Sequence, residues 1–585
     1  MKVHDYAHNA YWAQNETLNA LSTAAFILAG LLALIPPLRH VADRHLDKLS
    51  RRPLKTHLLW VGLAYLGVLA WFCFIRFCQY RAYLLPVDTS NDIQSAYTFL
   101  HYGILEYPIW GVKVLGIHFS LLMAVFSPVL LLWNNPLSFL FLQNIFICSA
   151  PFAMYALVFW LTSSSMAGVS GTILVLSSPY LYELLTSNLN AFNASLCAFL
   201  PWAMFFFYLR RWWWFAAFIL LMVCEKEQVP LIFFGMGLYA VYALRDKKPW
   251  NWAAGAAICA ASLALWMGEM KIIAHYDLGI GRESAQGGAQ NWAYFKSMVP
   301  GDVPVGKIAH EILGHPLRTI LTCFSSKYRF YPLLRVLFST GFLCFLAPMH
   351  MLPFWTAIFP QVLSSPGTPL DFWNHKPISY WDFGLHHSSY FFGPLLWATA
   401  HGIGAAYKKL SLRNRQSWLL VWILAFSGFG FKYAHRTIDP HQFPEWFDAA
   451  PRAMVKIPPK ARLWTLEYLS PPLSYRRWIK LIMWGPQDPP GYYSLFKPDY
   501  ALLDKAFVVY AEPPYRDKML TFFSQNRYKK IFDDSQVILL QSPAAAADPE
   551  AAPERIQLPA PDLKASQSYG LYLVRSPVES LPPPP

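Results

Sequence analysis

Apolar stretches about 20 residues long recur along most of this 585-residue chain. A helix of that length crosses the roughly 30 Å hydrocarbon core of a bilayer, where each backbone polar group must be hydrogen-bonded within the protein. Only 14% of the residues are charged and 55% are hydrophobic, whereas about a quarter of the residues of a soluble domain are charged. The repeated runs therefore predict an all-α polytopic membrane bundle.

Basic connectors between the apolar runs orient this bundle, because Lys and Arg are enriched in cytoplasmic loops. We expect residues 39–57, 210–211, 245–248 and 407–415 on the cytoplasmic side. The candidate spans are residues 18–38, 58–78, 118–133, 137–161, 167–185, 191–209, 214–223, 230–244, 252–275, 332–347, 352–363, 391–406 and 418–431.

The parity of the crossings singles out one apolar segment that should not span. Between the loop of Asp92, predicted outside, and Arg210, predicted inside, the number of crossings must be odd, yet four apolar segments lie there. The segment 118–133 is the shortest, begins at His118 and contains Pro128, which favours a bent, re-entrant or interfacial piece. About twelve transmembrane helices with both termini outside then follow from the basic connectors.

The chain divides by composition into four parts. We expect an extra span with a basic loop at 1–56, the main transmembrane domain at 57–433 and a small C-terminal α/β domain at 434–541. Residues 542–585 are rich in Ala and Pro and are predicted to be disordered. No basic stretch leads directly into a short apolar core at the N-terminus, so no cleavable signal peptide is expected.

Charge and cysteine content argue against a nucleic-acid-binding protein and against a disulfide-stabilised scaffold. The net charge of +14 is spread over short connectors rather than gathered in one patch, which argues against a nucleic-acid partner. Of the eight cysteines, only Cys323 lies in a polar loop, so a disulfide framework is not expected.

Several polar residues of this apolar chain are predicted to lie on its outer side. Acids near membrane depth tend to face cavities or partners, so these residues suggest an outward-opening cleft lined by carboxylates and imidazoles. Each also has a structural explanation: a helix cap, a hydrogen-bonded histidine or a solvated turn. They are Asp88 and Asp92 in VDTSNDIQSAY, His118, Lys226 and Glu227 in CEKEQ, and His386 and Tyr390 in LHHSSYFFGP.

The order of these segments resembles a prokaryotic family of multi-pass predicted membrane proteins. That family is defined by a domain of unknown function and is grouped with the GT-C glycosyltransferases, among them the protein mannosyltransferases and the aminoarabinose transferase of lipid A. The resemblance runs from about residue 76 to 540 and includes LGIHFSLLMAVFSPV, CEKEQVPL and HHSSYFFGPLL. Its most specific pieces are HFS at His118, KE at Lys226 and DYALLD at Asp499.

The resemblance implies a GT-C-like fold and assigns roles to the polar residues. An acid in the first outer loop of such enzymes is catalytic, which points to Asp92 as general base, with Asp88 as the runner-up. His118, Glu227, His386 and Tyr390 would line the donor cavity, and Lys226 would meet the phosphate of the carrier. A divalent cation is a candidate cofactor, with Asp92 and His118 as its candidate ligands.

The chain departs from the expected family pattern at Asn193, which stands where an acid or histidine is expected before Pro and Glu. This change raises the alternative of an altered or lost activity. The extra span 18–38 lies outside the shared region.

We therefore expect an inner-membrane glycosyltransferase that moves a sugar from a polyprenyl-phosphate donor to an envelope glycan, lipid or protein on the non-cytoplasmic face. The reaction would be a direct displacement that inverts the anomeric carbon, and the C-terminal domain would lie outside. Two alternatives stay open: a transporter or flippase for a lipid-linked solute, and a non-catalytic scaffold of envelope assembly. A transporter would favour a midplane site in paired, broken helices, whereas the polar residues here gather on one side.

Overall fold

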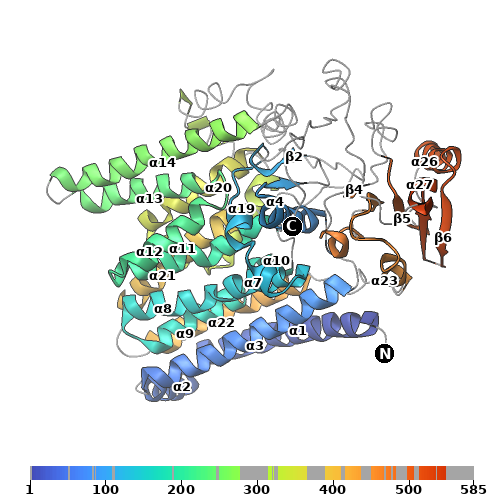
Figure 1. Cartoon of the computed structure of the whole chain (residues 1–585). Coiled ribbons are helices and arrows are strands. Elements are labelled where there is room, and N and C mark those ends of the chain that lie inside the picture. Colours follow the sequence, from blue (N-terminus) through green and yellow to red (C-terminus); the bar gives the residue numbers. More distant parts are fainter. Residues whose placement is uncertain are drawn as a thin grey trace.

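The structure is a computed structural model of the chain (Figure 1). It describes residues 3–50, 53–81, 85, 87–107, 112–116, 118–186, 190–245, 249–276, 314–315, 317–318, 321, 327–364, 389–409, 415–436, 449–466, 469–475, 479–481, 497–505, 513–534 and 536–547.

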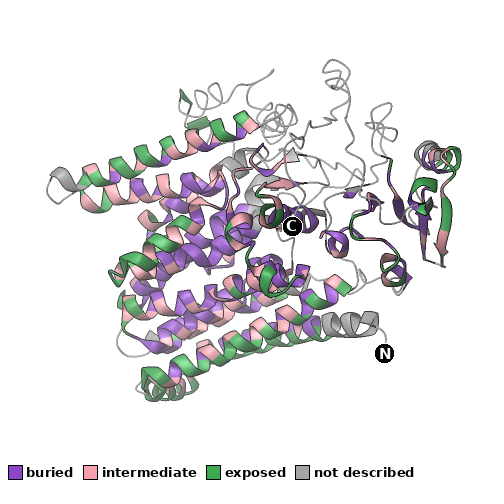
Figure 2. Cartoon of the chain, viewed as in Figure 1, coloured by how far each residue is buried: buried purple, intermediate pink, exposed green. Residues whose placement is uncertain are grey.

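Two long helices at the N-terminus lie along one side of the bundle. Helix α1 (Val3–Leu34) is separated by Ile35 from the basic helix α2 (Pro36–Ser50), and α3 (Leu54–Arg81) returns in the opposite direction. Figure 2 shows wide exposed faces on α1 and α3, and those faces carry large apolar side chains such as Leu28, Trp60 and Leu66. Apolar residues exposed in a continuous band are what a helix presents to lipid.

The buried core lies among the shorter helices behind α1 and α3, and α21 runs through it with nearly every residue buried (Figure 2). Its main partners are α8, α11, α20 and the 3₁₀ turn η4 (Leu343–Leu346). Besides α1 to α3, the longer helices of the bundle are α7 (Pro136–Cys148), α8 (Ala150–Thr162), α9 (Ser165–Leu176), α10 (Pro179–Thr186), α11 (Leu196–Tyr208), α12 (Trp212–Val223), α13 (Val229–Leu244), α14 (Pro249–Tyr276), α19 (Lys327–Phe338), α20 (Leu352–Ser364), α21 (Ser389–Lys409) and α22 (Arg415–Arg436).

Four helices in the described part of the chain are long and apolar enough to cross a membrane. They are Ala13–Leu34, Leu54–Arg81, Pro136–Thr162 and Trp252–Tyr276. The other apolar helices are shorter, so the expected total of about twelve spans remains a prediction. Two of the expected spans break near their middle and are wrong as continuous helices. In residues 167–185 the helix is interrupted at Ser177 and Ser178, before Pro179. In residues 332–347 the helix ends at Phe338, and Gly341 follows with a φ of +60°.

The segment that parity excludes from spanning is short and broken. Helices α5 (Leu122–Phe126) and α6 (Val129–Leu132) are interrupted at Ser127 and Pro128, and together they fall well below the roughly 20 residues of a span. The backbone N–H groups of Leu121 and Leu122 donate hydrogen bonds to the carbonyl of Cys224, at 2.7 and 3.1 Å. This segment is therefore attached to the turn between α12 and α13, and its non-spanning character stays a prediction.

Helix α4 (Val87–Tyr102) and a small hairpin lie on the side of the bundle opposite α2 (Figure 1). The hairpin pairs β1 (Glu106–Tyr107) with β2 (Val112–Lys113), and the 3₁₀ turn η1 (Val114–Gly116) follows. Helix α4 packs against β1 and α5. The loop after the second span thus folds back onto the bundle.

The C-terminal residues form a five-stranded sheet with an apolar core of its own. The strand order is β4-β3-β5-β7-β6, with β3 parallel to β4 and β5, and β7 antiparallel to β5 and β6. The DYALLD motif contributes Asp499, which accepts hydrogen bonds from the backbone and guanidinium of Arg462, and then β5. The elements are α23 (Ala449–Met454), β3 (Leu463–Thr465), η10 (Pro471–Leu473), β4 (Ile479–Leu481), β5 (Tyr500–Asp504), α26 (Pro513–Gln525), β6 (Lys529–Asp533), β7 (Val537–Gln541) and α27 (Pro543–Ala547).

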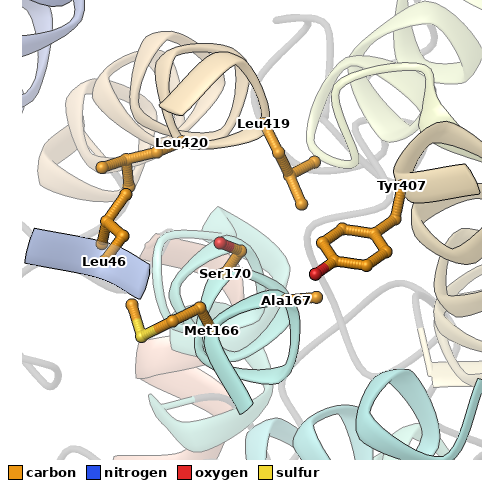
Figure 3. Close-up of a pocket in the computed structure, with 7 residues that line it drawn as sticks. All are labelled: Leu46, Met166, Ala167, Ser170, Tyr407, Leu419 and Leu420. Atoms are coloured by element: carbon orange, nitrogen blue, oxygen red, sulfur yellow. The ribbon is translucent and has the colours of Figure 1, made fainter. Parts of the chain in front are cut away.

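A small cavity lies at the α2 side of the bundle (Figure 3). Side chains of α2, α9, α21 and α22 line it, among them Leu46, Ser170 and Tyr407. Its volume of about 10 Å³ leaves room for about one water molecule. The cavity is too small for a lipid-linked sugar, and α4 lies on the other side of the bundle.

Candidate functional site

Helix α4 is polar in sequence, yet it is buried on all sides where the candidate base lies. Every residue from Thr89 to Ala96 is buried, including Ser90, Asn91 and Gln94. A surface helix would expose its polar face, and buried polar groups normally have hydrogen-bond partners. The surroundings of α4 must therefore be polar as well.

Asp92 is held by a tyrosine from the hairpin that follows α4. Its side chain is buried, and the hydroxyl of Tyr107 in β1 donates a hydrogen bond to Asp92 Oδ1 at 3.2 Å. The hydroxyl of Ser95 also donates to the Asp92 carbonyl, at 2.8 Å. A hydrogen bond from a neutral donor orients a carboxylate without removing its negative charge, which suits a base.

The same hairpin leads to His118. The N–H of Val114 donates to the carbonyl of Leu105, and the N–H of His118 donates to the carbonyl of Val114. Tyr107 and His118 therefore belong to one folded unit, although a loop outside the described residues separates β1 from β2.

His118 pairs with Glu227 across two distant parts of the chain. Its Nδ1 lies 3.1 Å from Glu227 Oε1, and the N–H of Phe119 donates to Glu227 Oε2 at 3.1 Å. Both carboxylate oxygens of Glu227 are thus engaged by the non-spanning segment.

Lys226 is a buried cation in the turn between α12 and α13. It is 2% exposed, and its Nζ lies 5.7 Å from the centre of the Tyr390 ring, in the first turn of α21. Its neighbours Glu225 and Glu227 both interact electrostatically with it. A buried charge is costly unless such neighbours compensate it.

The pKa values of the two glutamates in this turn, Glu225 and Glu227, shift in opposite directions. Burial opposes ionisation of Glu227, but His118 and, to a lesser degree, Lys226 outweigh it and lower the pKa of Glu227 to about 2. Burial raises the pKa of the Glu225 carboxyl well above its usual value, despite Lys226 and the backbone N–H of Leu196. Glu227 is therefore the firmly charged partner of His118.

Glu269 belongs to this cluster and was not among the residues singled out from the sequence. It lies in α14, is 1% exposed and interacts electrostatically with Glu227. An acid inside an otherwise apolar span is a functional signal, so the sequence did carry a trace of it. What it lacked was any indication that α14 packs beside the Glu227 turn.

Several buried polar atoms around these residues have no hydrogen-bond partner within the described part of the chain. In native proteins each such atom calls for an explanation, such as a bound water, ion or ligand. The atoms are Asn91 Oδ1, Ser120 Oγ and both carboxylate oxygens of Glu269. Asn91 is next to Asp92 in the sequence and Ser120 is two residues after His118, so these atoms belong to the segments that carry the candidate site.

The structure brings together four of the predicted site residues: His118, Lys226, Glu227 and Tyr390. Asp92 is connected to them through the Tyr107 hairpin and the packing of α4 on α5, not by a direct contact among those described. The side chain of Asp88 and the whole of His386 lie outside the described residues.

The predicted metal ligands Asp92 and His118 bind different partners, Tyr107 and Glu227. Among the residues that the structure describes, no group of three or more His, Cys, Asp or Glu side chains could hold a metal ion. A divalent cation with Asp92 and His118 as its ligands remains a prediction.

Asn193, the departure from the family pattern, is fully buried in the 3₁₀ turn η2 (Asn190–Ser195). The preceding Phe192 has a φ of +66° and packs its ring on Phe126 of α5. This turn lies between α5, α11 and α21. Asn193 is thus placed next to the elements that carry the site.

The chain was compared with solved structures, curated proteins and family models. Two solved structures show similarity: ArnT from Cupriavidus metallidurans bound to undecaprenyl phosphate, at 13% identity, 83% coverage of this chain, 98% of that chain and a TM-score of 0.46, and the same protein in the apo state, at 11% identity, 82% and 98% coverage and a TM-score of 0.39. No curated protein matches the chain.

A family model described as "Predicted membrane protein (DUF2079)" matches residues 91–539. The matched region begins just before Asp92 and ends in β7, so it includes the candidate residues from Asp92 onward, but not Asp88, and most of the C-terminal sheet. The protein is an integral membrane protein, and it belongs to the DUF2079 family of predicted membrane proteins.

Proposed function

We propose that this protein transfers a sugar from a polyprenyl-phosphate donor to an acceptor of the cell envelope, with Asp92 as the general base. The support is the buried carboxylate of Asp92, which Tyr107 orients. It lies on the same side of the bundle as buried Lys226 and its neighbours. The family resemblance of the sequence supplies the donor class.

The proposed step is a single displacement. The acceptor oxygen or nitrogen attacks the anomeric carbon while its proton passes to a carboxylate oxygen of Asp92. The bond between the anomeric carbon and the phosphate oxygen breaks, and its electron pair stays on the phosphate. Lys226 would stabilise this anionic leaving group as a point charge.

The observation that carries the proposal is a set of buried polar atoms without partners among the described residues: those of Asn91 and Ser120, close in sequence to Asp92 and His118, and those of Glu269, which interacts with Glu227. Each costs about 1–3 kcal/mol if it stays unsatisfied. A sugar phosphate offers both hydroxyl donors and charged acceptors, so its binding would recover much of this cost. A purely apolar ligand would not.

The reaction would take place on the non-cytoplasmic side of the inner membrane. Lys408 and Lys409 end α21 beside Tyr407, which lines the cavity with Leu46 of α2. The positive-inside rule then assigns the α2 side to the cytoplasm. Helix α4 and the C-terminal α/β domain would lie outside.

The test uses purified protein in lipid nanodiscs with a panel of polyprenyl-phosphate sugars and extracted envelope acceptors. We expect donor consumption by the wild type and by the control Asp517→Asn, on the exposed face of α26, and at least 100-fold less by Asp92→Asn. Transfer that is indifferent to Asp92 across the panel would refute the proposal. A chelator arm of the same assay tests the candidate divalent cation.

A transporter is the second candidate, and one observation favours it. Inside the bundle, the imidazoles of His350 and His401 stack with ring centres 3.7 Å apart, and Tyr239 and Tyr208 hydrogen-bond their Nε2 atoms. Polar pairs at membrane depth often mark transport pathways. Flux of a lipid-linked sugar across proteoliposomes that is lost in His401→Phe and retained in Asp92→Asn would support transport.

A further inference from the structure

Residues 469–475 leave the C-terminal sheet after β3 and pack against α4; we call them the docking segment. Ser470 and Ser474 are fully buried, and η10 in the middle of the segment packs on α4. The N–H of Leu473 and the hydroxyl of Ser474 both donate to the carbonyl of Ser470. The segment therefore forms a compact turn rather than an extended linker.

Two contacts join the docking segment to α4. The hydroxyls of Ser470 and Ser90 are hydrogen-bonded at 2.5 Å, and both side chains are fully buried. The ring of Tyr475 packs edge-on against the ring of Tyr97, with centres 5.8 Å apart. Tyr475 also packs against the main apolar core of the bundle.

These contacts flank the candidate base along the helix. Ser90 precedes Asp92 by two residues and Tyr97 follows it by five, so the two attachments hold the helix on both sides of the carboxylate. A hydrogen bond and a ring contact at separate turns limit both rotation and translation of the helix. The direction of the Asp92 side chain depends on both.

The docking segment also explains how a polar helix can be buried. Ser90 would be left in an apolar contact or in water without the hydroxyl of Ser470, because buried hydroxyls need partners. A displacement of about 1 Å in a reacting group can reduce a rate about 100-fold. Docking can thus decide whether the base is in place.

We propose that the C-terminal domain positions the base: Ser470 and Tyr475 are positioning residues that fix α4, and with it Asp92, for transfer. This inference rests on the proposed role of Asp92. It gives the C-terminal domain a part in the chemical step, separate from any recognition of the acceptor.

The kinetic test compares Ser90→Ala, Ser470→Ala and the double variant with the wild type. We expect each single change to lower kcat about 10-fold or more while the KM for the donor changes less than about 3-fold. The double variant should be no worse than either single variant, because both hydroxyls serve one hydrogen bond. Ser542→Ala, a buried serine that caps α27 in the same domain, is the control and should keep the wild-type kcat.

A cross-link tests the docking without any turnover. In native membranes, Ser90→Cys with Ser470→Cys should form a disulfide on mild oxidation. Ser90→Cys with Leu520→Cys, on the exposed face of α26, should not. Failure of the first pair to cross-link would overturn the docking.

The outcomes separate this inference from the proposed function. A cross-link together with an unchanged kcat in Ser470→Ala, while Asp92→Asn is inactive, would overturn positioning and leave the transferase standing. Activity that persists in Asp92→Asn would remove the proposed function, and positioning of a base would fail with it.

Discussion

The imidazole of His118 and the carboxylate of Glu227 are hydrogen-bonded, 3.1 Å from Nδ1 to Oε1, between residues 109 positions apart. The pair joins the non-spanning segment to the turn that carries Lys226. This contact therefore holds His118 beside Glu227 and Lys226.

This pair should make stability depend on pH. The folded state lowers the pKa of Glu227 from 4.5 to about 2, so its contribution is fully present above about pH 4.5 and is lost as the pH falls toward 2. At 1.36 kcal/mol per pKa unit, a shift of this size corresponds to roughly 3 kcal/mol. Thermal unfolding in nanodiscs between pH 6 and 3 should show a steeper decline for the wild type than for Glu227→Gln or His118→Gln. Equal slopes would contradict the assignment.

Tyr107→Phe should slow turnover without weakening donor binding. The variant loses only the hydroxyl that donates to Asp92, and hydrogen bonds to charged groups contribute about 1.5–3 kcal/mol. We expect kcat to fall about 10- to 100-fold with little change in KM. Tyr242→Phe, a partly exposed tyrosine at the end of α13, is the control and should match the wild type; a change in KM alone would argue that Tyr107 contacts the donor instead.

Lys226→Gln should weaken the donor interaction. Loss of the ammonium removes the cation that would meet the phosphate, and it also removes a charge that lowers the pKa of Glu225 and of Glu227. We expect at least a 100-fold loss in kcat/KM and a lower unfolding temperature, whereas Lys432→Gln, an exposed lysine of α22, should change neither. Normal turnover of a folded Lys226→Gln protein would exclude Lys226 from the site.

Gly402→Ala should destabilise the bundle. A Cβ on Gly402 would lie 1.8 Å from the carbonyl oxygen of Leu343, so α21 and η4 would have to separate; such overpacking costs about 1–3 kcal/mol. At Gly404, two residues along the same helix, the nearest atom would be an ordinary 3.4 Å away. The unfolding temperature should therefore fall for Gly402→Ala and stay near the wild-type value for Gly404→Ala.

The arrangement of the site was only partly predictable. The polar stretch at Asp92, the non-spanning segment at His118 and the Lys226 turn were all visible in the sequence, because each interrupts an apolar pattern. Glu269 and Tyr107 were not singled out, since neither is close in sequence to the residues it contacts. The breaks at Ser177 and Gly341 were missed because apolar composition continues through them.

The sequence by itself determined the membrane character of the protein. The length and hydropathy of a helix are local properties, and they decide whether the helix is stable in a bilayer. Only the tertiary structure decided that α4 is buried on all sides from Thr89 to Ala96, that the Tyr107 hydroxyl contacts Asp92 and that Ser470 contacts Ser90. The last contact joins residues 380 positions apart, and such a contact leaves no local signature because it depends on how whole helices and a separate sheet pack together.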